Sequence, residues 1–365
     1  MQLVLIITLV LVVAAWSFFR QRQFGRLPRG ERLSNIRKSV NYRNGSFQNQ
    51  HHTPQLSEGA SYTAVLAEFL FKKKARTRPL EPLPTIKTDL HQLAARENVL
   101  IWFGHSSYFI QVDGKKILVD PVFSGAASPL PMGTRAFAGS DIYKAADIPQ
   151  IDYLFISHDH WDHLDYKTML QLRSKISNVI CPLGVGEHLE RWGFNPASII
   201  EKDWYDQFPL AAGFEVTVTP ARHFGGRTLK RNSSLWASYV LKTPSLKIFI
   251  GGDSGYDTHF AEIGKQHGPF DLAILENGQY DKSWRYIHLL PEEFLAAAKD
   301  LRARKILPVH SSKFSLGNHA WDEPLSLVSE NNKAEKLQVI TPMIGELVHI
   351  ASETQQFTRW WEGVK

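Results

Sequence analysis

The strongest constraint on this chain of 365 residues is a short run of metal-binding side chains directly after a predicted strand. The run follows the apolar segment 152–157 and reads His158-Asp159-His160-Trp161-Asp162-His163. In an extended backbone, residues i and i+2 point the same way, so His158 and His160 can bind one ion. Where the chain turns into a helix, Asp162 and His163 can face a second ion. Such a density of imidazole and carboxylate groups indicates a metal site.

Three later predicted strands also end in a residue that can bind metal. The segments FEVTVTPARH, LKIFIGGD and KILPVH end in His223, Asp253 and His310. A single histidine after a strand is more often structural, but the three together complete two ion sites. The number of candidate ligands is that of a two-metal hydrolytic centre, in which the ions lie roughly 3.5–4 Å apart. We predict that Asp253 bridges two ions, one bound by His158, His160 and His223, the other by Asp162, His163 and His310.

The composition narrows the choice of metal. The chain has 15 histidines but a single cysteine, Cys181. A cysteine-rich zinc site and an internal disulfide are therefore both excluded. Imidazole and carboxylate ligands suit Zn²⁺ and also accept iron or manganese. We expect two zinc ions per chain, with other divalent ions as the alternative.

The N-terminus carries an uncharged apolar run at residues 3–19, LVLIITLVLVVAAWSFF. As a helix it would span roughly 25 Å, at the short end for a bilayer crossing. No Lys or Arg precedes the run and bulky residues follow Ala14-Ala15, so an uncleaved anchor at residues 1–20 fits better than a signal peptide. Basic residues from Arg20 to Lys38 favour a cytoplasmic catalytic domain.

A basic and polar segment, residues 21–80, separates this anchor from the predicted domain. Residues 39–58 lack periodicity, so we expect a linker or an embellishment draped on the fold, with His51 and His52 in solvent. Residues 61–74 are expected to form an amphipathic helix. The cations at its end fit either contact with anionic lipid headgroups or a solvated helix C-terminus; they are Lys72, Lys73, Lys74, Arg76 and Arg78.

From residue 98, short runs rich in β-branched and aromatic residues alternate with turns and helices. This pattern predicts an α/β fold with one catalytic domain at residues 81–350 and a C-terminal tail at 351–365. We expect Pro291 at the first position of the last helix. The expected strands are 99–104, 107–112, 115–120, 152–157, 178–182, 214–220, 234–243, 246–252, 271–276 and 305–310. The expected helices are 165–174, 184–192, 257–265 and 291–303.

The run at 158–163 and its downstream partners resemble the metallo-β-lactamase superfamily. The resemblance is closer to N-acylphosphatidylethanolamine-hydrolysing phospholipase D and its bacterial relatives, and it covers roughly residues 80–350. It implies an αββα sandwich with the metals at one edge, between two sheets. The segments that carry it are WFGHSSYFIQVDGKKILVDPVFS (102–124), ISHDHWDHLDY (156–166), TPARH (219–223), GGDSGY (251–256) and HLLPEE (288–293).

The resemblance also implies roles for residues beyond the ligands. His288 matches a position near the metals, where it could donate a proton to a leaving alkoxide; a packing or helix-cap role is the alternative. His105 and Asp120 match residues that orient ligands from behind. We count Asp162, together with His288, as a candidate catalytic residue.

The leading functional prediction is a phosphodiesterase of the phospholipase D type that acts on N-acylphosphatidylethanolamine-like membrane phospholipids. The alternative is a metal-dependent lactonase or esterase for a small substrate, which needs a small polar pocket instead of an apolar groove. No ligand is missing, which argues against a binding module without activity. The basic residues gather near the anchor, so no nucleic-acid partner is expected. The expected partners are phospholipid and the bilayer, and the oligomeric state, a homodimer included, is left open.

Overall fold

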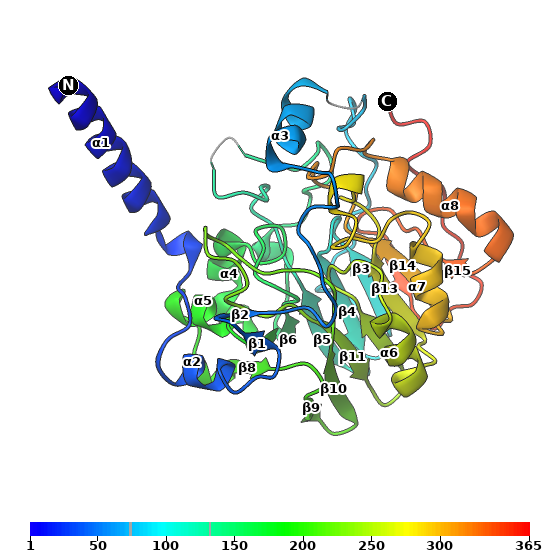
Figure 1. Ribbon diagram of the computed structural model, residues 1–365. Helices are drawn as coiled ribbons and strands as arrows, with labels where there is room; N and C mark the ends of the chain where they lie inside the picture. The colour runs from blue at the N-terminus through cyan, green and yellow to red at the C-terminus, as the bar shows by residue number, and fades with distance from the viewer. Residues whose placement is uncertain (73–74, 131–132) are drawn as a thin grey trace.

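Two seven-stranded β-sheets face each other in the computed structural model, which describes residues 1–72, 75–130 and 133–365 (Figure 1). In sheet order, the first sheet contains β16 (Leu347–His349), β3 (Val99–Trp102), β4 (Tyr108–Val112), β5 (Lys115–Val119), β6 (Ile151–Phe155), β7 (Ile176–Pro182) and β8 (Ile199–Lys202). The second contains β15 (Gln338–Val339), β14 (Lys305–Val309), β13 (Leu272–Glu276), β12 (Lys247–Ile250), β11 (Ser238–Lys242), β10 (Phe214–Thr219) and β9 (Gln207–Ala211).

The two sheets share one pairing pattern. From β16 to β5 and from β9 to β12 the neighbouring strands are antiparallel. From β5 to β8 and from β12 to β15 they are parallel. Strands β3, β5 and β6 therefore run in one direction within the first sheet, and β10, β12, β13 and β14 do so within the second. The segments after these strands bring the candidate site residues together.

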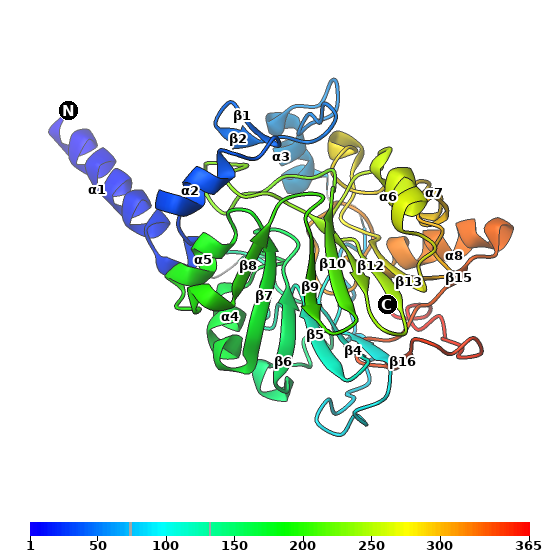
Figure 2. The same ribbon diagram turned by 90° about the horizontal axis from the view of Figure 1, so that it is seen from below.

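Alternation along the strands divides the core into three layers, because successive side chains of a strand point to opposite faces. Ile117 and Val216 pack between the sheets. Leu118 packs outward under α4 (Tyr166–Leu172) and α5 (Gly186–Arg191), and Phe249 packs outward under α6 (His259–His267) and α7 (Phe294–Asp300). Helix α8 (Glu323–Glu335) lies beside α7, and Figure 2 shows the helices on both sides of the sheets. The αββα sandwich is thereby confirmed.

The structure differs from the sequence-based expectations at several element ends. All ten expected strands are present, but β8, β9, β15, β16 and helix α8 were not expected, and neither were the short helix and hairpin within residues 30–47. Pro291 is not the first residue of α7, because the helix begins at Phe294 after Glu293. The Glu293 side chain accepts a hydrogen bond from the backbone N–H of Leu290 at 3.0 Å, which closes a turn ahead of the helix.

The N-terminal helix α1 (Gln2–Phe19) stands away from the domain and has no buried residue (Figure 1). By length and composition it could cross a membrane. The segment that follows it packs on the domain, through η1 (Arg22–Phe24), α2 (Gly30–Ile36) and the hairpin β1 (Tyr42–Arg43) and β2 (Ser46–Phe47). Phe24, Ile36 and Phe47 are buried. At the other end of the chain, Trp360 and Trp361 pack into the core between the sheets.

Helix α3 (Tyr62–Phe71) occupies most of the expected helix 61–74. Lys73 and Lys74 lie outside the described residues. Tyr62, Leu66 and Phe71 expose more than half of their surface.

Candidate metal centre

Three histidines from the two sheets form the first group of possible metal ligands. His158 and His160 follow β6, and His223 follows β10. His158 Nε2 lies 2.9 Å from His160 Nδ1, which lies 3.2 Å from His223 Nε2. His223 Nδ1 donates to the carbonyl of Ile287 at 2.7 Å, so its Nε2 is free to act as a ligand. The structure thus brings together the three residues predicted for one ion.

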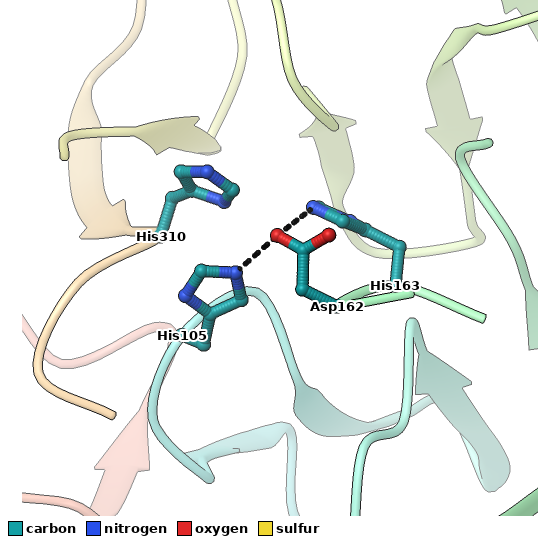
Figure 3. A group of neighbouring side chains, drawn as sticks. All are labelled: His105, Asp162, His163 and His310. Atoms are coloured by element: carbon teal, nitrogen blue, oxygen red, sulfur yellow. Dashed lines mark hydrogen bonds and ion pairs between the residues drawn. The ribbon is translucent and has the colours of Figure 1, made fainter. Parts of the chain in front are cut away.

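The second group contains Asp162, His163 and His310 together with His105 (Figure 3). One potential ligand atom of each lies within 4.8 Å of the others. Asp162 Oδ2 is 3.5 Å from His163 Nε2, and it also accepts a hydrogen bond from His105 Nε2 at 2.8 Å. His105 therefore contacts Asp162 directly, in an orientation that would hold this carboxylate in place.

Asp253, which follows β12, lies between the two groups. Its Oδ2 is 3.7 Å from His223 Nε2 and 3.8 Å from His158 Nε2. The same oxygen is 3.2 Å from His163 Nε2, and Oδ1 is 3.1 Å from His310 Nδ1. A carboxylate in this position can reach both groups, as a bridging ligand must.

The donor atoms fit a pair of divalent cations. His163 Nε2 and Asp253 Oδ1 are buried and have no hydrogen-bond partner among the described residues, although buried polar atoms are normally paired. Burial and the neighbouring imidazoles hold the pKa of His158 and of His223 well below the usual range. A lowered pKa favours the neutral ring, which is the form that binds metal. Imidazole and carboxylate ligands without thiolate suit Zn²⁺ and other divalent ions.

Further hydrogen bonds hold the candidate ligands from behind. Asp120 Oδ2 pairs with His163 Nδ1 at 2.8 Å, and Asp120 Oδ1 accepts from the backbone N–H of Ser157 at 2.8 Å. Ser106 Oγ lies 2.8 Å from His310 Nδ1, the same nitrogen that lies 3.1 Å from Asp253 Oδ1. Such contacts fix the orientation of an imidazole and which of its nitrogens can face a metal.

His288 forms a buried pair with Glu276, a residue that was not predicted. His288 Nδ1 lies 2.6 Å from Glu276 Oε2, and Glu276 Oε1 accepts from the backbone N–H of Ser254 at 2.7 Å. Burial lowers the pKa of His288, but the Glu276 carboxylate outweighs this effect and the pKa is raised overall. Glu276 ends the apolar strand β13, and His310 likewise follows an apolar strand, so the same pattern in the sequence indicates both residues.

A cavity of about 280 Å³ opens beside these residues. His160, Asp162 and His288 line it on the side of the metal-binding cluster. Apolar side chains form much of the remaining wall, namely Leu56, Tyr62, Val65, Phe224, Trp284 and Ile287. Part of this wall comes from residues 55–65. No pattern in the sequence predicted that these residues lie near the site.

A two-sheet αββα sandwich with clustered histidines and aspartates at one edge defines the metallo-β-lactamase fold class. Comparison with protein families agrees, since the beta-lactamase superfamily domain matches residues 115–311. The chain therefore belongs to the beta-lactamase superfamily.

Similar proteins include both uncharacterized and named members. An uncharacterized protein of Mycobacterium tuberculosis is 35% identical over 329 residues, covering 89% of this chain and 88% of that protein. The N-acyl-phosphatidylethanolamine-hydrolyzing phospholipase D 1 of Caenorhabditis elegans is 27% identical over 313 residues, covering 76% of this chain and 86% of that protein. Among solved structures, the metallo hydrolase Igni18 of Ignicoccus hospitalis has a TM-score of 0.52 at 20% identity, covering 69% of this chain and 98% of that one. This last similarity concerns the fold alone.

Proposed function

We propose that this superfamily member is a two-zinc hydrolase, a phosphodiesterase of the phospholipase D type that acts on N-acylphosphatidylethanolamine-like membrane phospholipids. The observation that carries the proposal is the cavity with a largely apolar wall, which opens beside the clustered ligands and the His288–Glu276 pair. The similarity to the Caenorhabditis elegans phospholipase D supports the same class of substrate.

The proposed ligands form two sets, one for each ion. Bound divalent ions would supply Lewis acidity, which generates a nucleophile from water and neutralises charge on a substrate oxygen. Within the chain, His105 would keep Asp162 oriented and Asp120 would do the same for His163. One ion would be held by His158, His160 and His223, the other by Asp162, His163 and His310, with Asp253 shared between them.

His288 is the proposed proton donor to the leaving group. Glu276 occupies its Nδ1, so Nε2 is the nitrogen available to a substrate in the cavity. The carboxylate favours the protonated ring, and an alkoxide leaving group needs a proton as it departs.

The surface around the cavity suits a lipid substrate. Helix α3 contributes Tyr62 and Val65 to the cavity wall, and Glu68 is its only charged residue. Its apolar side chains Tyr62, Leu66 and Phe71 are exposed. The helix itself lies at the top of the domain in Figure 1, on the side toward which α1 projects. With α1 as the anchor and the basic residues after it in the cytoplasm, an exposed apolar helix would meet the same bilayer.

The size of the cavity favours a second candidate, a lactonase or esterase for a small substrate. A volume of about 280 Å³ is too small to enclose a diacyl phospholipid. In the lipid proposal, the phosphodiester therefore enters the cavity while the acyl chains stay in the bilayer. A small ester or lactone, in contrast, could enter the cavity as a whole.

The two candidates are separated by assaying the full-length protein, loaded with zinc, on two substrates. One is N-acylphosphatidylethanolamine in vesicles, and the other is a lactone of similar acyl length. We expect release of N-acylethanolamine and phosphatidic acid, and loss of this activity when a chelator removes the metal. Hydrolysis of the lactone with no release of N-acylethanolamine would contradict the proposal and favour the second candidate.

A further inference from the structure

Aromatic side chains connect the end of the anchor helix to the ligand loop, which we define as residues 158–163. The ring of Phe24 is almost fully buried, with its centre 5.0 Å from that of Phe18 and 5.3 Å from that of Phe19. The Phe24 and Trp161 rings also meet edge to face, at 5.2 Å between ring centres. Trp161 lies between His160 and Asp162 in the chain, so Phe24 contacts the residue that separates two candidate metal ligands.

The buried Arg227 makes a second connection. Its guanidinium carbon lies 3.9 Å from the centre of the Trp161 ring. Nη1 donates to the carbonyls of Asp159 at 2.9 Å and Leu164 at 2.6 Å, and Nη2 donates to the carbonyl of Gln23 at 3.0 Å. A buried guanidinium is costly unless its donors are satisfied. Arg227 therefore joins Asp159 in the ligand loop, and Leu164 directly after the loop, to the segment after the anchor.

A third connection runs through His188. The backbone N–H of Arg26 donates to His188 Nδ1 at 3.1 Å, so the proton of this ring is on Nε2. Nε2 lies 3.2 Å from Asp159 Oδ2, within the ligand loop. Gly25 makes this contact possible, because it has a φ of +68° and a Cβ there would lie 1.9 Å from His188 Nδ1.

Ion pairs keep the segment in place without touching the ligand loop. Arg32 Nη1 lies 2.7 Å from a Glu187 oxygen and 2.9 Å from a Glu190 oxygen, and Arg26 also pairs with Glu187. These contacts attach the residues after the anchor to α5 of the domain. They involve neither Phe24 nor Gly25, which make the contacts toward the ligand loop.

We propose that residues 18–26 position the metal centre, by contact with Trp161 and, through Arg227 and His188, with Asp159 in the ligand loop. The inference rests on the proposed metal centre and adds that the docking of the chain after the anchor sets metal affinity. Residues that support metal ligands from behind typically change metal affinity by about 10- to 100-fold when they are replaced.

The test compares Phe24→Ala and Gly25→Ala with the matched control Ile36→Ala in the full-length protein. Ile36 is fully buried in the same N-terminal segment but packs into the core between the sheets. Zinc content, the rate of zinc loss to a chelator and the visible spectrum of the Co²⁺-substituted protein are measured beside the urea midpoint. We expect Phe24→Ala and Gly25→Ala to weaken zinc binding about 10-fold and to alter the Co²⁺ spectrum. Ile36→Ala should lower the urea midpoint and leave zinc binding unchanged.

The outcomes separate this inference from the proposed function. A wild-type protein that binds no zinc would overturn both. Wild-type zinc affinity in Phe24→Ala and Gly25→Ala, or equal zinc loss in all three variants, would overturn the positioning role alone. If Phe24→Ala does not fold, Phe24→Leu replaces it, because leucine keeps the apolar volume and loses the aromatic edge contact with Trp161.

Discussion

Replacing Asp253 by alanine is expected to lower kcat/KM by at least about 10³-fold, a loss of about 4 kcal/mol of transition-state stabilisation. The two oxygens of this carboxylate face His163 and His223 on one side and His310 on the other. Its removal takes away the ligand that both proposed ion sites share and the negative charge that both sites need. Metal analysis should show fewer than two ions per chain, and steady-state kinetics should show the loss of turnover.

Asp271→Ala provides the control for this experiment. Asp271 is partly exposed, lies just before β13 and pairs with Arg304 at 3.0 Å, away from the candidate ligands. This variant should keep both ions and wild-type turnover. An Asp253→Ala protein with two ions and normal kinetics would exclude the bridging role.

Replacing His288 by asparagine is expected to lower kcat by roughly 10²–10⁴-fold, the usual contribution of a general acid. Both ions should remain bound, because His288 pairs with Glu276 and is not one of the proposed ligands. The loss should shrink for nitrophenyl phosphodiesters, whose leaving group needs no proton. Comparing kcat for good and poor leaving groups in the wild type and in the variant measures this difference.

A packing role for His288 would give a different result. The variant would then lose thermal stability and slow all substrates equally. Equal slowing of good and poor leaving groups would rule out the proton-donor role. Glu276→Gln is the companion variant, because it keeps the shape of the side chain and removes the charge that favours protonated His288.

The candidate metal ligands could be predicted from the sequence because each belongs to a short pattern of neighbouring residues. The run at 158–163 places several possible ligands within a single strand-to-helix turn. His223, Asp253 and His310 each follow an apolar run, and strands that run in the same direction bring such ends to one edge. The structure groups all of these residues within a few ångströms of one another.

The contribution of the N-terminal segment could not be predicted, because it depends on contacts between residues far apart in the chain. Asn49 bonds both backbone groups of His223, with Nδ2 at 2.8 Å from its carbonyl and Oδ1 at 3.1 Å from its N–H. No periodic pattern around Asn49 indicates this position. For the same reason, the sequence did not predict the contact between Phe24 and Trp161 or the position of Tyr62 in the cavity wall.

Short and edge elements were also missed. Strand β15 has two residues and β16 has three, which is too few for an alternating pattern to be recognised. Their positions are set by pairing with β14 and β3, whose own apolar runs are clear in the sequence.

Anomalous diffraction from crystals of the zinc-loaded protein tests the two-metal centre most directly. Data collected above and below the zinc absorption edge locate each ion without any assumption about its ligands. We predict two peaks roughly 3.5–4 Å apart. One should lie among His158, His160 and His223, the other among Asp162, His163 and His310, with Asp253 reaching both. The absence of zinc peaks, or a single peak away from these residues, would contradict the account.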